Sequence, residues 1–188
     1  MERISVRITG KRPLLVHSPN QMISARDMEK QPTRSARPDT IPIAQEAEGC
    51  LYKDHEGKLV VPSLCVLASM RNAGVNRIVP GKGKKTFKGY IFSGVQIEPN
   101  DIPLQSATGW VPDVKRVKKG NAYVPAARPR FDDWALEFEM QIVDPIISKA
   151  DLKEILTDAG KYNGLCDFRP LYGLFDVERF KEVKAVKN

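Results

Sequence analysis

The chain has 188 residues, 41% of them hydrophobic and 28% charged, with 30 Lys and Arg against 23 Asp and Glu, for a formal net charge of +7. This composition excludes wholesale disorder, and the length is typical of one domain, so we expect a single domain over residues 1–188 that carries long insertions. No apolar stretch approaches the about 20 residues needed to span a bilayer, and the first residues lack the apolar segment of a secretory signal. We therefore expect a cytoplasmic protein with no membrane partner.

The first half of the chain predicts a strand, a long loop and a helix. Apolar and polar residues alternate over 4–9, which indicates a half-buried strand. Residues 18–48 are polar and rich in proline without a sustained period, which indicates a long loop insertion. A hairpin signal then leads into an apolar helix over 64–72, with Ser63 as its N-cap and Gly74 just beyond its end.

The middle of the chain predicts two strands and a basic hairpin. Residues 90–97 have a strand-like pattern. Residues 105–130 are expected to form a basic β-hairpin insertion that turns at 119–121. The clearest alternation in the chain covers 134–142 and predicts the strongest strand.

The last part predicts a helix and a final strand, which completes a recognisable order. Ser148 and Asp151 have the spacing of a capping box at the start of a helix that Gly160 is expected to end, and alternation resumes over 175–178. Without its insertions the order is β-α-β-β-α-β, the α+β arrangement called ferredoxin-like or RRM-like. Both helices would cover one face of an antiparallel sheet, which leaves the other face, or a cleft beside it, for a ligand.

The positive charge is concentrated in two segments. Residues 71–88 hold six Lys and Arg and no acid, and residues 111–130 hold six against Asp113 alone. Together they carry +11, so the remainder of the chain carries −4. Such polarisation is typical of proteins that bind a phosphate backbone, and the glycines and rings over 81–90 favour close approach and stacking. The alternative is a pair of solvated lysine-rich loops.

Two further clusters favour the same chemistry. Arg128 and Arg130 stand beside two rings just before the strongest strand, and guanidinium groups bind phosphates with two parallel hydrogen bonds. Residues 160–175 combine glycines, cations and rings, which is consistent with a phosphate-binding loop that uses its backbone N–H groups, or with a glycine cap and an Asp167–Arg169 ion pair. The candidate nucleic-acid-binding residues are Arg71, Lys82, Lys84, Lys85, Lys88, Lys115, Arg116, Lys118, Lys119, Arg128, Arg130, Lys161, Tyr162 and Arg169.

Catalytic and metal motifs are sparse. His17 and His55 are the only histidines, neither in a metal-ligand spacing, and the chain has neither a Walker-type loop nor a Gly-x-Ser-x-Gly motif. The three cysteines lie far apart in the sequence, which is typical of reduced thiols in a cytosolic protein. We therefore expect no cofactor, no metal and no catalytic residue.

Three of these segments resemble the RAMP superfamily, the RRM-like subunits of CRISPR effector complexes, and among them the backbone subunits that polymerise along the guide RNA. Residues 51–71 resemble the pattern in which a short hairpin and a proline lead into an Arg-bearing helix. The basic hairpin over 111–124 lies where these subunits insert a thumb-like hairpin, and 160–175 resemble their glycine-rich loop before the last strand. The loop here is sparser in glycine, with Cys166 where another glycine is expected.

The resemblance implies a non-catalytic protomer in a ribonucleoprotein for antiviral defence. Its partners would be single-stranded guide RNA, the complementary target strand, further copies of itself in a row, and other effector subunits. Some family members cut target RNA with an acidic residue in the long loop. The aspartates in that loop of this chain are Asp27 and Asp39. Two alternatives stay open: a phage or mobile-element protein that binds or anneals single-stranded DNA, and a metal-dependent nuclease that uses Asp132, Asp133 and Asp167.

Overall fold

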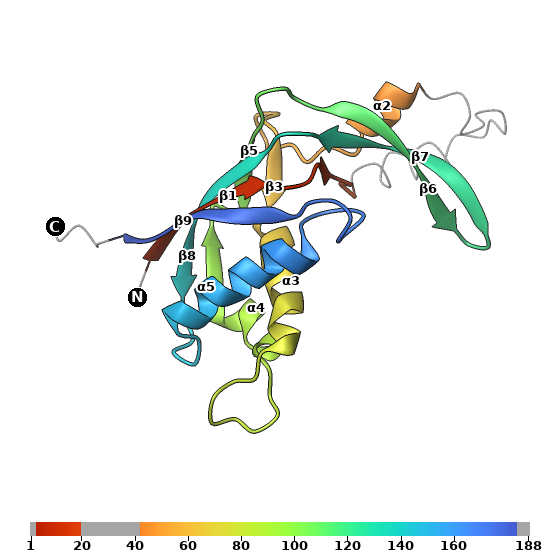
Figure 1. Cartoon of the computed structure of the whole chain (residues 1–188). Helices are drawn as coiled ribbons and strands as arrows, with labels where there is room; N and C mark the ends of the chain where they lie inside the picture. The colour runs from red at the N-terminus through yellow and green to blue at the C-terminus, as the bar shows by residue number, and fades with distance from the viewer. Residues whose placement is uncertain (1–2, 20–41, 184–188) are drawn as a thin grey trace.

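Two antiparallel sheets organise the computed structural model, which describes residues 3–19 and 42–183 (Figure 1). The strands are β1 (Arg3–Gly10), β2 (Leu14–Leu15), β3 (Val60–Pro62), β4 (Val95–Glu98), β5 (Asp101–Gln105), β6 (Val111–Lys119), β7 (Ala122–Phe131), β8 (Ala135–Ile142) and β9 (Phe175–Val183). The helices are α2 (Ile43–Glu48), α3 (Ser63–Ala73), α4 (Ile91–Gly94) and α5 (Lys149–Asp158), and the short helical turns are η2 (Gly74–Asn76), η3 (Phe87–Gly89) and η4 (Ala159–Asn163).

The main sheet contains the expected β-α-β-β-α-β core. Strands β4, β8, β1 and β9 lie side by side in that order, each antiparallel to its neighbour, and β5 and β3 extend the sheet beside β8. In chain order the four core strands are β1, β4, β8 and β9, with α3 after the first and α5 after the third. Both helices lie on one side of the sheet (Figure 1). The predicted ferredoxin-like α+β fold is therefore confirmed.

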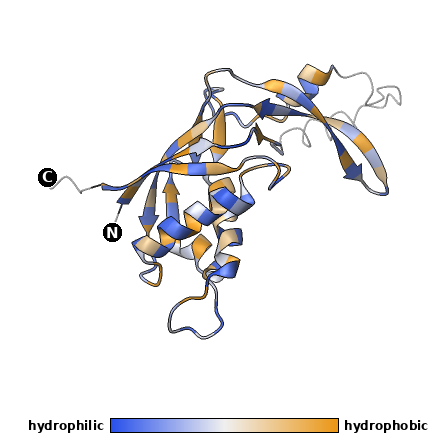
Figure 2. Cartoon of the chain, in the orientation of Figure 1, coloured by the Kyte–Doolittle hydropathy of each residue, from blue (hydrophilic) through white to orange (hydrophobic). Residues whose placement is uncertain are grey.

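Alternating side chains fix which sheet face meets the helices. Ile4, Val6 and Ile8 of β1 are fully buried, and the helices contribute Met70 and Leu152 to the same core. Hydrophobic and hydrophilic bands alternate along the strands in Figure 2. Burial of each such side chain is worth about 1.5–3 kcal/mol, and a register shift of one residue would expose the whole set, so this pattern locks the strand pairing.

The two core helices begin and end somewhat differently from expectation. The capping box is confirmed: Ser148 Oγ accepts from the Asp151 N–H at 3.1 Å while the Asp151 carboxylate accepts from the Ser148 N–H at 3.2 Å. Gly160 as the end of this helix is wrong, because the chain continues through η4 to Gly164, at φ +73°. In α3, Ser63 is already inside the helix and its side chain makes no cap, so the predicted N-cap is also wrong, whereas Gly74 follows the last turn as expected.

The strand expected over 90–97 is only partly correct. Residues Ile91–Gly94 form the helical turn α4, and β4 begins at Val95. A short apolar run does not distinguish a helical turn from a strand by period alone. Strand β5 was not expected at all; it pairs with β3 and with β8.

The basic hairpin is confirmed, but its strands begin at Val111, later than the start expected for the insertion at 105. Strands β6 and β7 pair without interruption from Val111 opposite Arg130 to Lys119 opposite Ala122, and with β2 they form the second sheet, which projects away from the main one (Figure 1). Helix α2 packs against this hairpin, so the end of the expected 18–48 loop is helical. Residues 20–41, with Asp27 and Asp39, lie outside the described residues. No helix in the described part of the chain is long and apolar enough to cross a membrane.

Candidate nucleic-acid interface

The distal half of the hairpin presents cations beside an exposed ring. The Arg116 guanidinium carbon lies 6.0 Å from the centroid of the Tyr123 ring, and Tyr123 is 63% exposed. Lys118 is exposed directly opposite Tyr123 in the strand register, and Lys119 follows at the end of β6. Neither Arg116 nor Lys118 forms an ion pair with a described residue, unlike the cations at the hairpin base. Their charge is thus available to an anionic ligand.

The base of the hairpin is tied to the loop before β9. Lys115 Nζ lies 2.8 Å from Asp113 Oδ1 and 5.0 Å from the centroid of the Tyr172 ring. Its pKa is raised by the hydrogen bond with Asp113 and, next, by that with Tyr172. Arg130 also pairs with Asp113, at 3.2 Å, and with Asp132, at 2.8 Å. Both cations are therefore largely neutralised within the fold.

Arg128 is a structural residue in this fold. It is 6% exposed, its Nε donates to Asp167 Oδ2 at 3.2 Å, and its Nη1 donates to the Ala127 carbonyl at 2.9 Å. Because Asp167 pairs with Arg128, the alternative Asp167–Arg169 ion pair is wrong. Arg128 is therefore not part of the interface, since a buried guanidinium with partners cannot reach a phosphate.

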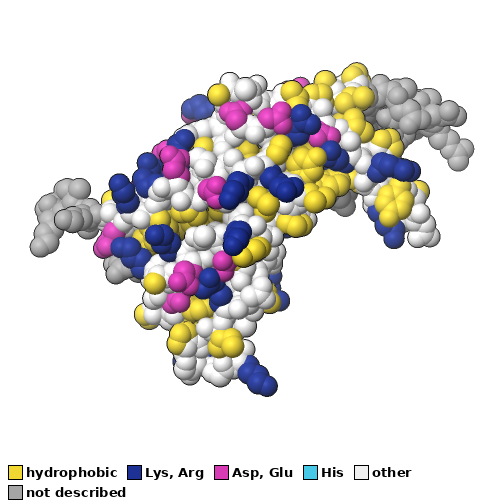
Figure 3. Space-filling model, in the orientation of Figure 1, with side chains coloured by type: hydrophobic (Ala, Val, Ile, Leu, Met, Phe, Trp, Pro, Cys, Tyr) yellow, Lys and Arg dark blue, Asp and Glu magenta, His cyan; other side chains and the backbone are white. Residues whose placement is uncertain are grey.

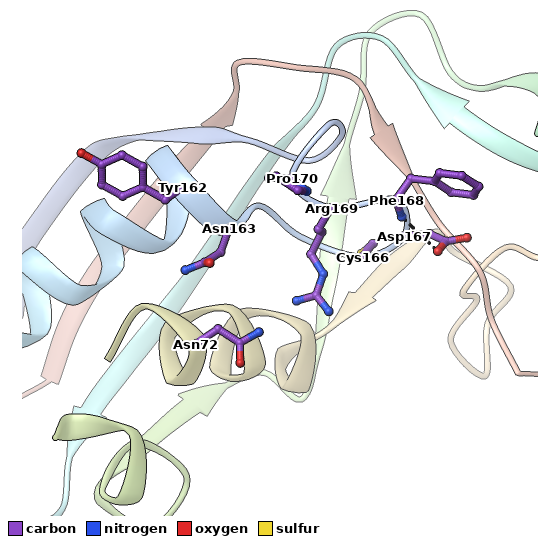
Figure 4. Close-up of a pocket in the computed structure, with 8 residues that line it drawn as sticks. All are labelled: Asn72, Tyr162, Asn163, Cys166, Asp167, Phe168, Arg169 and Pro170. Carbon is purple, nitrogen blue, oxygen red and sulfur yellow. Dashed lines mark hydrogen bonds between the residues drawn. The ribbon is translucent and has the colours of Figure 1, made fainter. Parts of the chain in front are cut away.

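A pocket of about 410 Å³ opens between the end of α3 and the loop before β9 (Figure 4). Asn72 of α3 and Asn163 of η4 line it with Arg169, whose guanidinium points toward α3 in the close-up. The exposed Tyr162 also lines it, and Lys161 Nζ lies 4.9 Å from the centroid of that ring. The Asn163 amide already donates to the Ser69 carbonyl at 3.5 Å, and Asp167, which also lines the pocket, is paired with Arg128. The Arg169 guanidinium is therefore the group in this pocket that is suited to phosphate oxygens. We call this the pre-β9 pocket.

The backbone of the pre-β9 loop does not act as expected. The Leu165 N–H donates to Gly173 at 2.9 Å, the Asp167 N–H to Leu15 at 2.9 Å, and the Gly173 N–H to Pro13 at 2.8 Å. A Cβ on Gly173 would lie 2.2 Å from the Leu165 carbonyl oxygen, so glycine serves this close packing. These N–H groups are committed to the fold, and side chains rather than backbone supply the donors of the pocket.

A second pocket, of about 650 Å³, lies on another side of α3. We call it the α3-end pocket; its lining residues are Arg71, Lys85, Thr86, Lys88, Gly89, Tyr90 and Phe92. Lys82 and Lys84 lie outside it, exposed in the loop beyond Val79. Figure 3 shows dark-blue side chains without magenta neighbours on the distal part of the hairpin and at the end of the lowest loop, whereas blue and magenta side chains intermix at the hairpin base and over the sheet.

The open sheet face is covered by paired charges. Arg7 donates to Glu137 and to Glu178, Arg179 Nη2 lies 3.2 Å from Glu137, and Arg3 lies 3.7 Å from Glu139. The described residues of β1 and β8 place no aromatic ring on this face. The predicted fold left two places for a ligand, the open face of the sheet and a cleft beside it. The paired charges on the open face favour the cleft.

Several residues of these sites were missed by sequence reasoning. Asn72, Asn163 and Phe92 carry no sequence signal, because only tertiary packing brings them to a pocket. Cys65 and Cys166 are distant in sequence, yet a hydrogen bond joins their thiols, and together with burial it raises the pKa of Cys166 well above its usual range. All three cysteines are free thiols, and only the fold brings Cys65 and Cys166 together.

The aspartates of the nuclease alternative have separate structural partners. Asp132 binds Arg130, Asp167 binds Arg128, and Asp133 accepts hydrogen bonds from the turn over 106–108. Within residues 3–19 and 42–183, no three His, Cys, Asp or Glu side chains group in a way that could hold a metal ion.

Comparison with known proteins supports the fold. No protein-family model matches the sequence, and no curated protein matches it. The structure is similar to one chain in the cryo-EM structure of the Type III-B Cmr-beta bound to cognate target RNA, with a TM-score of 0.63 and 14% sequence identity. The match covers 98% of this chain and 61% of that one, so this chain spans less than two thirds of the length of its structural neighbour.

Proposed function

We propose that this protein is a backbone subunit of a CRISPR-type ribonucleoprotein, which binds single-stranded guide RNA without cutting it. The observation that carries the proposal is the projecting hairpin β6–β7 (Figure 1), whose distal half combines the exposed Tyr123 with Arg116 and Lys118, two cations that form no ion pair with a described residue. A similar fold in a Cmr chain from a target-RNA complex supports it. So does the resemblance of three sequence segments to the RAMP superfamily.

The proposed contacts are tolerant of sequence. Arg116 and Lys118 on the hairpin, and Arg169 in the pocket, would take phosphates, while Tyr123 and Tyr162 would stack on bases. A hairpin lying across the strand would interrupt the guide, so that bases on either side are presented to a complementary target strand. Further copies in a row, with other effector subunits, would continue the same path.

The test compares single-stranded RNA with single-stranded DNA of the same sequence in filter-binding titrations at several salt concentrations. We expect tighter binding to RNA. In an Arg116→Ala, Lys118→Ala double variant the slope of log affinity against log salt should fall by about 1.4, because each phosphate contact on a single strand contributes about 0.7.

The matched control removes two lysines that the fold neutralises. Lys11 lies 2.9 Å from Asp176 and Lys149 lies 2.7 Å from Glu182, so a Lys11→Ala, Lys149→Ala variant loses the same formal charge. Its slope should stay close to that of the parent protein. Equal slopes in the two variants would show that the hairpin is only a solvated loop without phosphate contacts. Tight binding to DNA with little binding to RNA would favour the alternative of a DNA-binding or annealing protein.

A further inference from the structure

The α3-end pocket combines an exposed ring with three cations that form no ion pair with a described residue. Phe92 is 50% exposed, and the Arg71 guanidinium carbon lies 5.3 Å from the centroid of its ring. Lys85 and Lys88 complete the basic lining, and no carboxylate lines the pocket among the described residues. Arg71 alone could be explained by its place in the last turn of α3, where cations interact favourably with the helix dipole, but the two lysines lie outside that helix.

The fold holds this pocket in place although its neighbouring loop is long. Ile78 and Thr86 form a β-bridge, the Phe87 N–H donates to the Arg77 carbonyl at 3.0 Å, and Phe87 itself is 2% exposed. Arg77 in turn donates to Asp158 of α5 at 2.7 Å. Lys85 and Lys88 therefore stand on the anchored end of the loop, so less side-chain and backbone freedom is lost when they bind a ligand.

Successive residues of α3 separate the two pockets. Asn72 lines the pre-β9 pocket while Arg71 lines the α3-end pocket, because neighbouring helix residues point about 100° apart. A strand held in the first pocket can thus continue over the end of α3 into the second.

We propose that the α3-end pocket receives one unpaired base of the bound single strand. The base packs on Phe92, and Arg71, Lys85 and Lys88 contact the phosphates that flank it. Stacking on an aromatic side chain tolerates any base, and a flanking guanidinium binds a phosphate strongly, so the pocket fixes the position of a nucleotide without reading its identity. This inference rests on the proposed binding of single strands but not on the role of the hairpin.

The experiment measures the affinity of the full-length protein for single-stranded RNA and for an abasic RNA of equal length, which keeps the phosphates and lacks the bases. Phe92→Leu keeps apolar volume and removes the ring, and Phe92→Tyr keeps the ring. We expect Phe92→Leu to weaken binding to base-bearing RNA on the order of 10-fold and to leave binding to abasic RNA unchanged. Phe92→Tyr should bind both RNAs like the parent, and Lys85→Ala with Lys88→Ala should weaken both.

Two results would overturn the inference: unchanged affinity of Phe92→Leu for base-bearing RNA, or an equal loss for base-bearing and abasic RNA. Failure of the proposed function is distinguishable from either. If the hairpin variant behaves like its control while Phe92→Leu still discriminates between the two RNAs, the hairpin proposal falls and the base pocket stands. If the hairpin variant lowers the salt slope while Phe92→Leu changes nothing, the reverse holds.

Discussion

Asp133 links the hairpin to the main sheet through a single carboxylate. It accepts hydrogen bonds from the Ala107 N–H at 2.6 Å, the Thr108 N–H at 3.2 Å and the Ser106 hydroxyl at 3.2 Å, with a further bond from the Thr108 hydroxyl. The hydroxyl of Thr108 and these backbone donors lower the pKa of Asp133 to about 2. The charged form is therefore the one that holds the turn.

We expect Asp133→Asn to lower the melting temperature at pH 7 and to change its acid dependence. The folded pKa lies below the unfolded value of about 3.9, so the contribution of Asp133 is complete above about pH 4 and is lost as pH falls toward 2. The difference in melting temperature between parent and variant should therefore shrink over that range, as followed by circular dichroism. Asp132→Asn, which removes only an exposed ion pair, is the matched control and should have a smaller effect at pH 7. A difference that stays constant down to pH 2 would contradict the assignment.

Arg128 shows why residue type and neighbourhood cannot by themselves identify a ligand contact. In the sequence it is an arginine two positions before Arg130, in the same short run that also contains Phe131 and Trp134. The two arginines of β7 carry the same charge but have different surroundings. Arg128 is buried against Asp167, whereas Arg130 is partly exposed beside Asp113 and Asp132. Asp132 is a local partner of Arg130, but Asp167, which neutralises Arg128, comes from a distant segment that a local pattern does not reveal.

At the scale of elements, Gly160 has a different task from the one its sequence position suggests. A Cβ at Gly160 would lie 2.3 Å from the Phe175 carbonyl oxygen, so the absence of a side chain lets η4 pass directly over the start of β9. Gly160→Ala should destabilise the fold by about 1–3 kcal/mol, because neither backbone can give way without moving a sheet strand. Chemical denaturation measures the change.

The matched control is Gly89→Ala. No atom lies within 4 Å of a Cβ at Gly89, so this variant should unfold within about 0.5 kcal/mol of the parent. If Gly160→Ala were equally neutral, the contact between η4 and β9 would be looser than the structure shows.

Elements with strong local patterns were predictable, and those defined by distant partners were not. The alternation in β1 and β8 and the capping box of α5 are encoded within a few residues, and all three were confirmed. Strand β5 exists because β3 and β8 flank it, and α4 forms where Gly94 packs against Ile147, whose Cδ1 would lie 2.8 Å from a Cβ at that glycine. Likewise the basic segments were evident as charge, but their division into free and neutralised cations depended on the tertiary fold.

For the whole molecule, the net positive charge predicts how copies would assemble on a strand. The chain carries a net charge of +7, so free copies repel one another until a polyanion lies between them. We expect little self-association without RNA, and a number of bound copies that rises in steps as the single strand is lengthened, as measured by mass photometry. A single copy at every RNA length would contradict assembly in a row, and the same steps without RNA would contradict the electrostatic explanation.

The contact of Lys115 with Tyr172 makes the hairpin a lever with a defined pivot. From Lys115 to Lys119 the arm spans four residue steps of about 3.4 Å, or about 14 Å, so a rotation of about 10° at Lys115 would displace the end of β6 by about 2 Å. Because Tyr172 belongs to the loop that forms the pre-β9 pocket, small repacking there is magnified at the far end of the arm. The position of the hairpin tip thus depends on the packing of the loop before β9 against Lys115.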